Sequence, residues 1–176
     1  MVNSAVGNFS SISDKSQFYA ELLSQCQSLI EGERYWVTNL ANLASLIYHG
    51  LNDISPKHIN WAGFYVATKN NPEELTLGPF QGKVACTRIP FGKGVCGEAA
   101  ASRNVQIVPD VHKFPGHIAC DSASNSEIVI PLVHENRVVG VLDIDCEEIE
   151  GFDEQDKAGL VPIAQAIVDG CNWSDL

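Results

Sequence analysis

The 176-residue chain lacks the features that mark a membrane protein, a nucleic-acid-binding protein or a secreted protein. It has no apolar run as long as the roughly 18 residues that a membrane-spanning helix needs. Residues 1–15 lack the basic and apolar regions of a secretory signal peptide. Because 11 Lys and Arg face 22 Asp and Glu, the net charge of −11 makes nucleic acid and anionic membranes poor partners.

The six cysteines lack the spacing of a disulfide frame or of a zinc site. No C-x-x-C motif is present, and the chain is larger than the small secreted domains that depend on disulfides. Together with the lack of a targeting segment, this predicts the reducing cytoplasm. His112, His117 and Cys120 form the best candidate set of metal ligands, but their spacing matches no usual zinc pattern. We therefore predict no metal site.

An ordinary globular composition, 45% hydrophobic and 19% charged, predicts a single domain over residues 1–176. Residues 1–13 are expected to be a loosely ordered N-terminal segment. Helical periodicity predicts three long helices and one short helix, at 14–31, 35–51, 153–171 and 97–102. Strand patterns occur at 59–68, 74–80, 83–91 and 104–110, and in a hairpin that turns at Glu135–Asn136.

These elements predict an α+β domain with a central antiparallel sheet of about six strands. Helices would cover one face of the sheet, and the other face would be left for a ligand pocket.

Three cysteines, Cys86, Cys96 and Cys120, lie among glycine, proline and polar residues rather than in an apolar period. This placement favours thiol chemistry over core packing. Cys96 begins a predicted helix, where unpaired N–H groups favour a thiolate. The other three cysteines fit apolar or peripheral positions and are assigned no chemistry.

Acidic residues concentrate in residues 121–156, which hold eleven of the 22 Asp and Glu and one basic residue, Arg137. Asp143 and Asp145 are two apart on a predicted strand and share a face. They are either the solvated end of that strand or the wall of a pocket for an ammonium group. A regular two-residue turn would send Glu127 to the opposite face, whereas a bulge would bring it beside the aspartates.

Five segments together resemble one known family: WAGFY (61–65), GPFQGKVAC (78–86), IPFGKGVCG (89–97), 108–132 and VVGVLDIDC (138–146). They are similar to the free methionine-(R)-sulfoxide reductases, a branch of the GAF-domain proteins, and the likeness covers about residues 14–172. The resemblance implies a GAF fold and reduction of free L-methionine (R)-S-oxide to L-methionine. It also implies electrons from thioredoxin, and so indirectly from NADPH, with no bound cofactor.

The resemblance also implies roles for individual residues. The redox cysteines would be Cys86, Cys96 and Cys120, and the substrate contacts would be Glu127, Asp143, Asp145, Trp61 and Tyr65. Trp61 and Tyr65 are four apart on a strand, so they share a face and could hold the thioether end of the substrate.

We expect Cys120 to be the nucleophile, with Cys96 as its rival. Either Cys86 or Cys96 would then resolve a sulfenic acid to a disulfide. The proton donor, the formation of a homodimer and the acceptance of other small sulfoxides stay open. Two other functions fit the sequence: a non-catalytic GAF sensor of a small molecule or of redox state, and a metal-binding module.

Overall fold

A six-stranded antiparallel sheet forms the centre of the protein in the computed structural model, which describes residues 7–54, 58–117 and 121–176. The strand order is β3-β2-β1-β6-β5-β4, so the first and last long strands are neighbours in the middle of the sheet. The strands are β1 (Ile59–Thr68), β2 (Asn71–Gly82), β3 (Arg88–Pro90), β4 (Gln106–Val108), β5 (Ser126–His134) and β6 (Arg137–Cys146).

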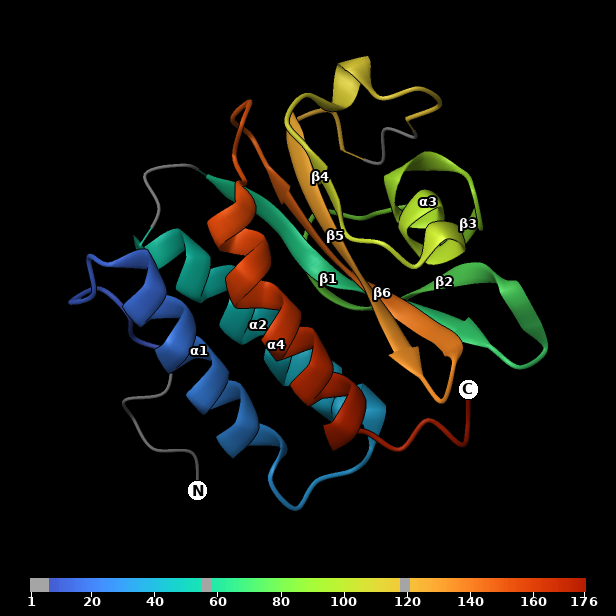
Figure 1. Cartoon of the computed structure of the whole chain (residues 1–176), viewed down its shortest axis with the longest axis horizontal. Coiled ribbons are helices and arrows are strands. Elements are labelled where there is room, and N and C mark those ends of the chain that lie inside the picture. Colours follow the sequence, from blue (N-terminus) through green and yellow to red (C-terminus); the bar gives the residue numbers. More distant parts are fainter. Residues whose placement is uncertain (1–6, 55–57, 118–120) are drawn as a thin grey trace.

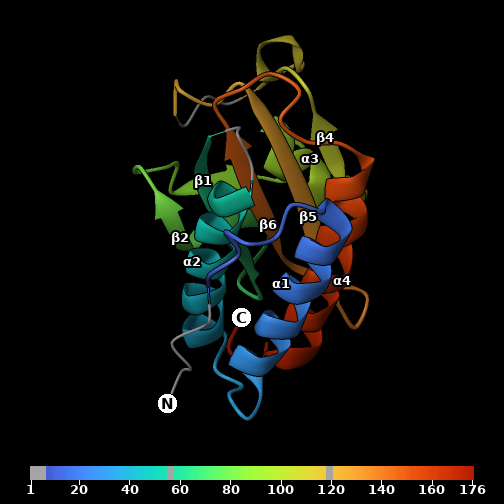
Figure 2. The same ribbon diagram turned by 90° about the vertical axis from the view of Figure 1, so that its left-hand side faces the viewer.

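Three long helices cover one face of this sheet, and a short helix lies on the opposite side (Figure 1). The long helices are α1 (Lys15–Ile30), α2 (Trp36–Ile54) and α4 (Glu154–Gly170), and the short one is α3 (Gly94–Ser102). Figure 2 shows the three long helices together in front of the strands. A 3-10 turn, η1 (Val111–Lys113), follows β4. The predicted α+β architecture with helices on one face is confirmed.

Side-chain caps explain why the outer helices begin where the sequence predicts. The Asp14 side chain accepts a hydrogen bond from the Gln17 amide at the start of α1. Asp153 and Asp156 form a capping box at the start of α4. Lys15 Nζ lies 3.0 Å from Asp153 and 2.7 Å from Asp156, which ties the two helix starts together.

Several predicted boundaries are wrong by a few residues. Helix α2 continues to Ile54 past Gly50, because Gly50 packs against the Phe9 ring instead of ending the helix. Strand β2 begins at Asn71 rather than at residue 74, and β4 covers only 106–108. Strand β3 is limited to 88–90, since the chain leaves the sheet at Gly82, where φ is 124°.

One residue of the N-terminal segment, Phe9, is anchored in the core. Phe9 is fully buried, lies 5.1 Å from the Phe18 ring and donates its backbone N–H to Asp53. Residues 8, 10, 11 and 13 are exposed, so the expectation of a loosely ordered segment 1–13 stays a prediction, and residues 1–6 lie outside the described part of the chain.

Apolar side chains form two separate clusters, one on each face of the sheet. Phe64, Ile128 and Ile144 pack against the long helices. Trp61, Tyr65 and the residues of α3 pack on the other face. Because alternate residues of a strand point to opposite faces, the same three central strands supply both clusters.

None of the helices that the structure describes is long and apolar enough to span a bilayer.

Candidate active site

An irregularity in the β5–β6 hairpin decides which side chains face α3. Glu135 and Asn136 form the predicted two-residue turn, with φ values of 47° and 62°. The register then shifts between Leu132 and Val133, and Val139 has no register partner. This β-bulge moves every residue pair beyond it by one position.

The shift brings Glu127 to the same face as the two aspartates. Glu127 pairs with Asp145, and Val129 pairs with Asp143. The sequence left the parity of this hairpin open, and the bulge is the alternative that the structure adopts. Glu127, Asp143 and Asp145 are called the acid cluster below.

Strand β1 adds an aromatic wall beside the acid cluster. Trp61 pairs with Asp145, and Tyr65 lies on the same face four residues further along. The two rings stack with centroids 5.8 Å apart, and the Trp61 ring also stacks on Phe80 at 5.2 Å. A side chain at Gly63 would clash with both Phe80 and Trp61, so the glycine lets the rings approach. The prediction that Trp61 and Tyr65 share a face is confirmed.

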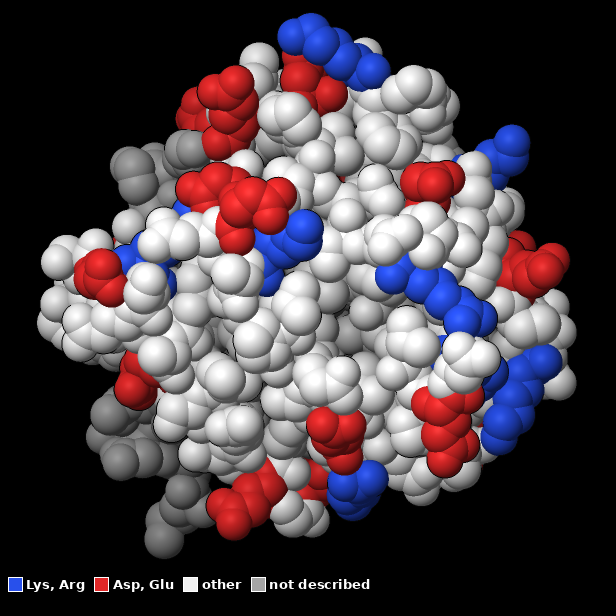
Figure 3. Space-filling view, in the orientation of Figure 1, with Lys and Arg blue, Asp and Glu red and all other residues white. Residues whose placement is uncertain are grey.

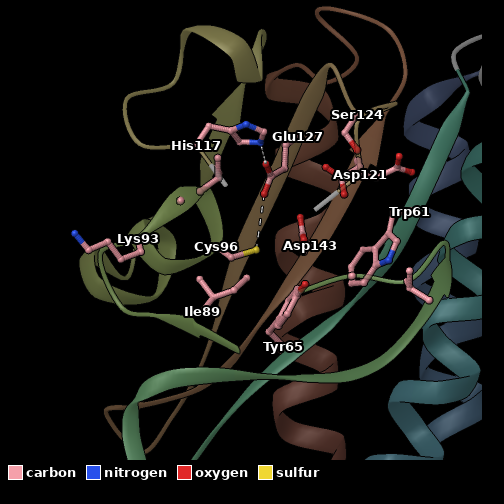
Figure 4. A pocket seen from close by; sticks show the side chains of 15 residues that line it. Trp61, Tyr65, Ile89, Lys93, Cys96, His117, Asp121, Ser124, Glu127 and Asp143 are labelled. Carbon is pink, nitrogen blue, oxygen red and sulfur yellow. Dashed lines mark hydrogen bonds and ion pairs between the residues drawn. The ribbon is translucent and has the colours of Figure 1, made fainter. Parts of the chain in front are cut away.

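These side chains line one pocket between the sheet and α3 (Figure 4). Its other walls come from the segment that follows β2, from the start of α3 and from the loop before β5. The cavity has a volume of about 40 Å³ and is open to solvent on one side, so it can hold more than one water molecule.

Cys96 faces the acid cluster from the first turn of α3. Its Sγ lies 3.8 Å from Glu127 Oε1, and the side chain is only 4% exposed. Burial and the negative charges of Asp143 and Glu127 raise the pKa of Cys96 well above its ordinary value. The prediction that the helix start favours a thiolate here is wrong, because burial and two carboxylates outweigh the helix dipole. The assignment of Cys96 outside the core is also wrong.

Glu127 and Asp143 are buried and Asp145 is half-buried, and this environment favours protonated carboxyl groups. Burial and the charges of Asp143 and Asp145 raise the pKa of Glu127 well above its ordinary value. Burial raises the pKa of Asp143 to about 6. Burial and the charge of Asp143 raise the pKa of Asp145, although a hydrogen bond with Ser124 acts in the opposite direction. At least one of these carboxyl groups can therefore hold a proton near neutral pH.

The nearby cationic groups do not neutralise these acids. His117 Nε2 lies 4.0 Å from Glu127 Oε2, but burial lowers the pKa of His117, which favours the neutral imidazole. Lys93 lines the pocket and points away from the acids in Figure 4. Asp143 Oδ1 is buried without a hydrogen-bond partner among the described residues. The site thus presents acceptors that a cationic ligand could satisfy.

The donor atoms of Cys96, Glu127 and Asp143 all lie within 4.8 Å of one another, a geometry that could also hold a metal ion. This set differs from the one we considered from the sequence. His112 Nε2 lies 2.8 Å from Asn125 Oδ1, and His117 Nε2 lies 4.0 Å from Glu127 Oε2. Cys120 lies outside the described residues.

The remaining cysteines differ in state. Cys86 is disulfide-bonded, whereas Cys26, Cys96 and Cys171 carry free thiols. Cys86 belongs to the segment that follows β2, whose residues Val84 and Ala85 line the pocket. Cys120, the predicted nucleophile, belongs to residues that the structure does not describe.

Two polar residues at this site were missed in the sequence. Ser124 lines the pocket, and Asn60 donates a 2.9 Å hydrogen bond to Ser124 Oγ. Ser124 lies in the polar run 122–126, where no pattern distinguishes one serine from another. Asn60 directly precedes Trp61, and its inward direction depends on strand pairing.

The surface acids are arranged differently from the acid cluster. On the face seen in Figure 3, acidic groups are spread over the surface, and several are next to a Lys or Arg. An acidic solvated face therefore describes part of the negative charge, while Glu127 and Asp143 are 6% exposed. The two interpretations of the acidic residues apply to different residues.

Comparisons with known proteins agree with this arrangement. A family model described as "GAF domain" matches residues 37–169. The chain is 49% identical over 165 residues to the free methionine-R-sulfoxide reductase of Saccharomyces cerevisiae, covering 93% of this chain and 91% of that protein. It is 51% identical over 147 residues to the Escherichia coli protein of the same name, covering 84% of each.

A solved structure of free methionine-R-sulfoxide reductase from Neisseria meningitidis, in complex with its substrate, has the same fold. The TM-score is 0.84 at 44% identity, and the match covers 91% of this chain and 92% of that one.

Proposed function

Because this chain belongs to the GAF-domain family of free methionine-R-sulfoxide reductases, we propose that it reduces free L-methionine (R)-S-oxide to L-methionine. The observation that carries the proposal is the buried acid cluster, which lies between an aromatic pair and a thiol. Buried acids without a cationic partner destabilise the fold. They are expected at sites where a ligand supplies the positive charge.

The acid cluster supports selection of a free amino acid. A free amino acid carries an α-ammonium group, which Asp143 and Asp145 could bind by charge-assisted hydrogen bonds. A methionine within a peptide has no such group, so the same carboxylates would be left without a partner. The Trp61 and Tyr65 rings could pack against the methyl and methylene groups of the substrate.

The start of α3 supports a place for the substrate carboxylate. Lys93, Gly94 and Val95 line the pocket, and the first backbone N–H groups of a helix have no partner within the helix. The Gly97 amide donates to Lys93 O, so the amides of residues 94–96 are the ones that have no partner within the helix itself. An anion at this helix end is favoured by the amides and by the helix dipole.

The proposed chemistry uses two cysteines and one carboxylic acid. The Cys120 thiolate attacks the sulfoxide sulfur, while a protonated carboxyl of the acid cluster donates its proton to the sulfoxide oxygen. Methionine is released, and the oxygen stays on Cys120 as a sulfenic acid. Attack by a second thiol forms a disulfide and releases the oxygen as water, so one sulfoxide is reduced as two thiols are oxidised.

We propose Cys86 as that second thiol. It is the described cysteine that is disulfide-bonded. Cys96, the alternative, carries a free and deeply buried thiol bonded to Glu127. Its position suits a group that orients Glu127 more than one that exchanges with a second protein, since thiol exchange requires access.

Recycling of the disulfide requires a dithiol reductant, and we propose thioredoxin, without a bound cofactor. The free thiols of Cys26, Cys96 and Cys171 suit the reducing cytoplasm that we predicted. A homodimer stays a prediction.

The test is NADPH consumption by the purified protein with thioredoxin and thioredoxin reductase. We expect turnover with free methionine-(R)-sulfoxide, little with the (S) epimer, and little with N-acetylmethionine-(R)-sulfoxide, which lacks the ammonium group. No consumption with the (R) epimer, or equal rates with both epimers, would contradict the proposal. Binding of the (R) epimer without turnover would instead support a sensor.

A further inference from the structure

Asn60 is a buried polar residue that a second bulge turns toward the pocket. Ile59 pairs with Cys146 and Trp61 pairs with Asp145, so Asn60 is an extra residue in β1 between two consecutive partners on β6. Ile59 packs on the helix side of the sheet, whereas Trp61 packs on the pocket side. In a regular strand these two residues would share a face. The bulge therefore turns the side chains that follow it to the opposite face.

The Asn60 amide connects two residues of the pocket. Its Nδ2 donates to Ser124 Oγ at 2.9 Å and to Asp121 Oδ2 at 3.4 Å. Both partners line the pocket, and Asn60 and Ser124 are only 7% and 5% exposed. The opposite orientation of the amide would place its oxygen against the Asp121 carboxylate, where neither atom can donate. Chemistry therefore assigns the donor role to the Asn60 nitrogen.

This orientation makes Ser124 a donor to the acid cluster. Since Ser124 Oγ accepts from Asn60, its own hydrogen is left for another acceptor. Ser124 and Asp145 line the same pocket, and the residues that follow them are hydrogen-bonded, since the Asn125 amide donates to Cys146 O at 2.9 Å. The hydrogen bond with Ser124 lowers the pKa of Asp145, against the larger effect of burial. Asn60 thus holds the Ser124 hydroxyl in place, and Ser124 favours the charged form of Asp145.

A second observation links Asn60 to ligand binding. Only two buried side-chain oxygens of the described residues have no hydrogen-bond partner, and they are Asn60 Oδ1 and Asp143 Oδ1. An unpartnered buried acceptor destabilises the fold. One of these atoms belongs to Asp143, a member of the acid cluster, and the other belongs to Asn60, which bonds Ser124. An unpartnered buried polar atom calls for an explanation, and a functional role of its residue is one.

We propose that Asn60 is a positioning residue for the ammonium subsite, which holds the Asp145 carboxylate in place through Ser124 and thereby sets the preference for a free amino group. The inference rests on the proposed function, since the ammonium group belongs to the proposed substrate. Asn60 acts through Ser124 and Asp145, and it is assigned no contact with the reacting sulfur.

The test compares Asn60→Ala, Ser124→Ala and the double variant on two substrates, free methionine-(R)-sulfoxide and its N-acetyl derivative. We expect each single variant to raise KM for the free substrate about 10-fold, the loss of about one charge-assisted hydrogen bond. The kcat should change by less than about 2-fold, and kcat/KM for the N-acetyl substrate should stay unchanged. The double variant should match the larger single effect, because both changes remove the hydrogen bond between Asn60 and Ser124.

Asn39→Ala is the matched control. Asn39 is also a buried asparagine, 2% exposed, but its amide bonds Glu33 O and Cys171 Sγ on the helix side of the molecule. It should lower the melting temperature and leave the preference between the two substrates unchanged.

Three results would overturn the inference. The first is an equal loss on both substrates in Asn60→Ala. The second is additive effects of the Asn60 and Ser124 changes, and the third is a change in preference in the Asn39 control. If Asn60→Ala does not fold, Ser124→Ala alone decides, because it must still raise KM for the free substrate selectively. Failure of the proposed function is distinguishable, since the wild-type protein would then not turn over the (R) epimer.

Discussion

The two faces of the central sheet are built from the same strands but bury different kinds of side chain. On the helix side, Phe64, Ile128 and Ile144 are buried among apolar side chains. On the pocket side, the residues that alternate with them include Glu127, Asp143 and Asp145. Burial of the apolar set stabilises the fold, whereas burial of the acids opposes it. One face of the sheet therefore serves stability, and the other holds destabilising groups for chemistry.

Two cysteines show the same contrast. Cys26, in α1, is fully buried among apolar residues, and burial raises its pKa to about 12. Cys96 is buried too, but the charges of Asp143 and Glu127 raise its pKa further in the same direction. The first is a core residue in the ordinary sense, while the second takes part in the network of the pocket.

The largest expected effect comes from the nucleophilic cysteine Cys120 and the resolving cysteine Cys86. Cys120→Ser should abolish methionine release even in a single turnover, because no sulfur remains to accept the oxygen. Cys86→Ser should release about one methionine per enzyme and then stop, since the sulfenic acid cannot be resolved. Single-turnover quantification of methionine distinguishes the two roles. Cys26→Ser, on the helix side, serves as the control with unchanged turnover, and a first turnover by Cys120→Ser would contradict the assignment.

A smaller effect is expected for Glu127→Gln, which should lower turnover and raise stability. Turnover should fall about 10²-fold or more if Glu127 donates the proton. Stability should change in the opposite direction. The pKa of Glu127 is raised in the folded state, so the folded protein keeps a proton that the unfolded chain releases above its ordinary pKa. The stability of the wild type therefore falls as pH rises from the ordinary pKa of a glutamate toward the raised pKa of Glu127. A glutamine carries no such proton, so the variant does not lose stability over this pH range.

Thermal melts across pH measure this difference. The melting temperature of Glu127→Gln should exceed that of the wild type at about pH 7, and the two should converge toward about pH 4. The control is Glu148→Gln, at an exposed position, which should alter neither turnover nor melting. A Glu127→Gln protein that melts lower than the wild type at neutral pH would show that the carboxyl is not destabilising.

Removal of an aromatic wall should have a moderate effect on binding. Trp61→Leu loses the stacking on Tyr65 and Phe80, so KM for the free sulfoxide should rise about 10-fold, with a smaller change in kcat. Trp36→Leu, on the helix side of the sheet, is the matched control and should leave KM unchanged. Steady-state kinetics of the two variants make the comparison, and equal KM values would remove Trp61 from the substrate site.

The smallest effect on activity is expected from the helix side. Ile144→Ala, between the two aspartates in sequence but on the opposite face, should lower the free energy of unfolding by about 2–5 kcal/mol. The KM of the folded protein should equal that of the wild type. Denaturant unfolding and steady-state kinetics test both statements. A KM shift as large as that of Asp143→Asn would show that the two faces are not independent.

The order of the elements and the residue types of the site could be predicted from local patterns. Helical periodicity and N-caps such as Asp14 and Asp153 mark α1 and α4 to within a residue or two, because caps act over one helical turn. The positive φ angles at Glu135 and Asn136 also follow from a two-residue hairpin turn. The motif residues Trp61 and Tyr65 share a face by alternation alone.

Only the tertiary structure decided which acids meet and which polar residues support them. The bulges at Val139 and Asn60 reverse the parity of their strands, and a bulge depends on how two strands pair rather than on either strand alone. The charge state of the Cys96 thiol also depends on contacts between distant parts of the chain. Its place at a helix start is local, but the carboxylates that raise its pKa come from β5 and β6, far away in the chain. Sequence by itself determined which chemical groups are present, and long-range strand register determined which of them act together.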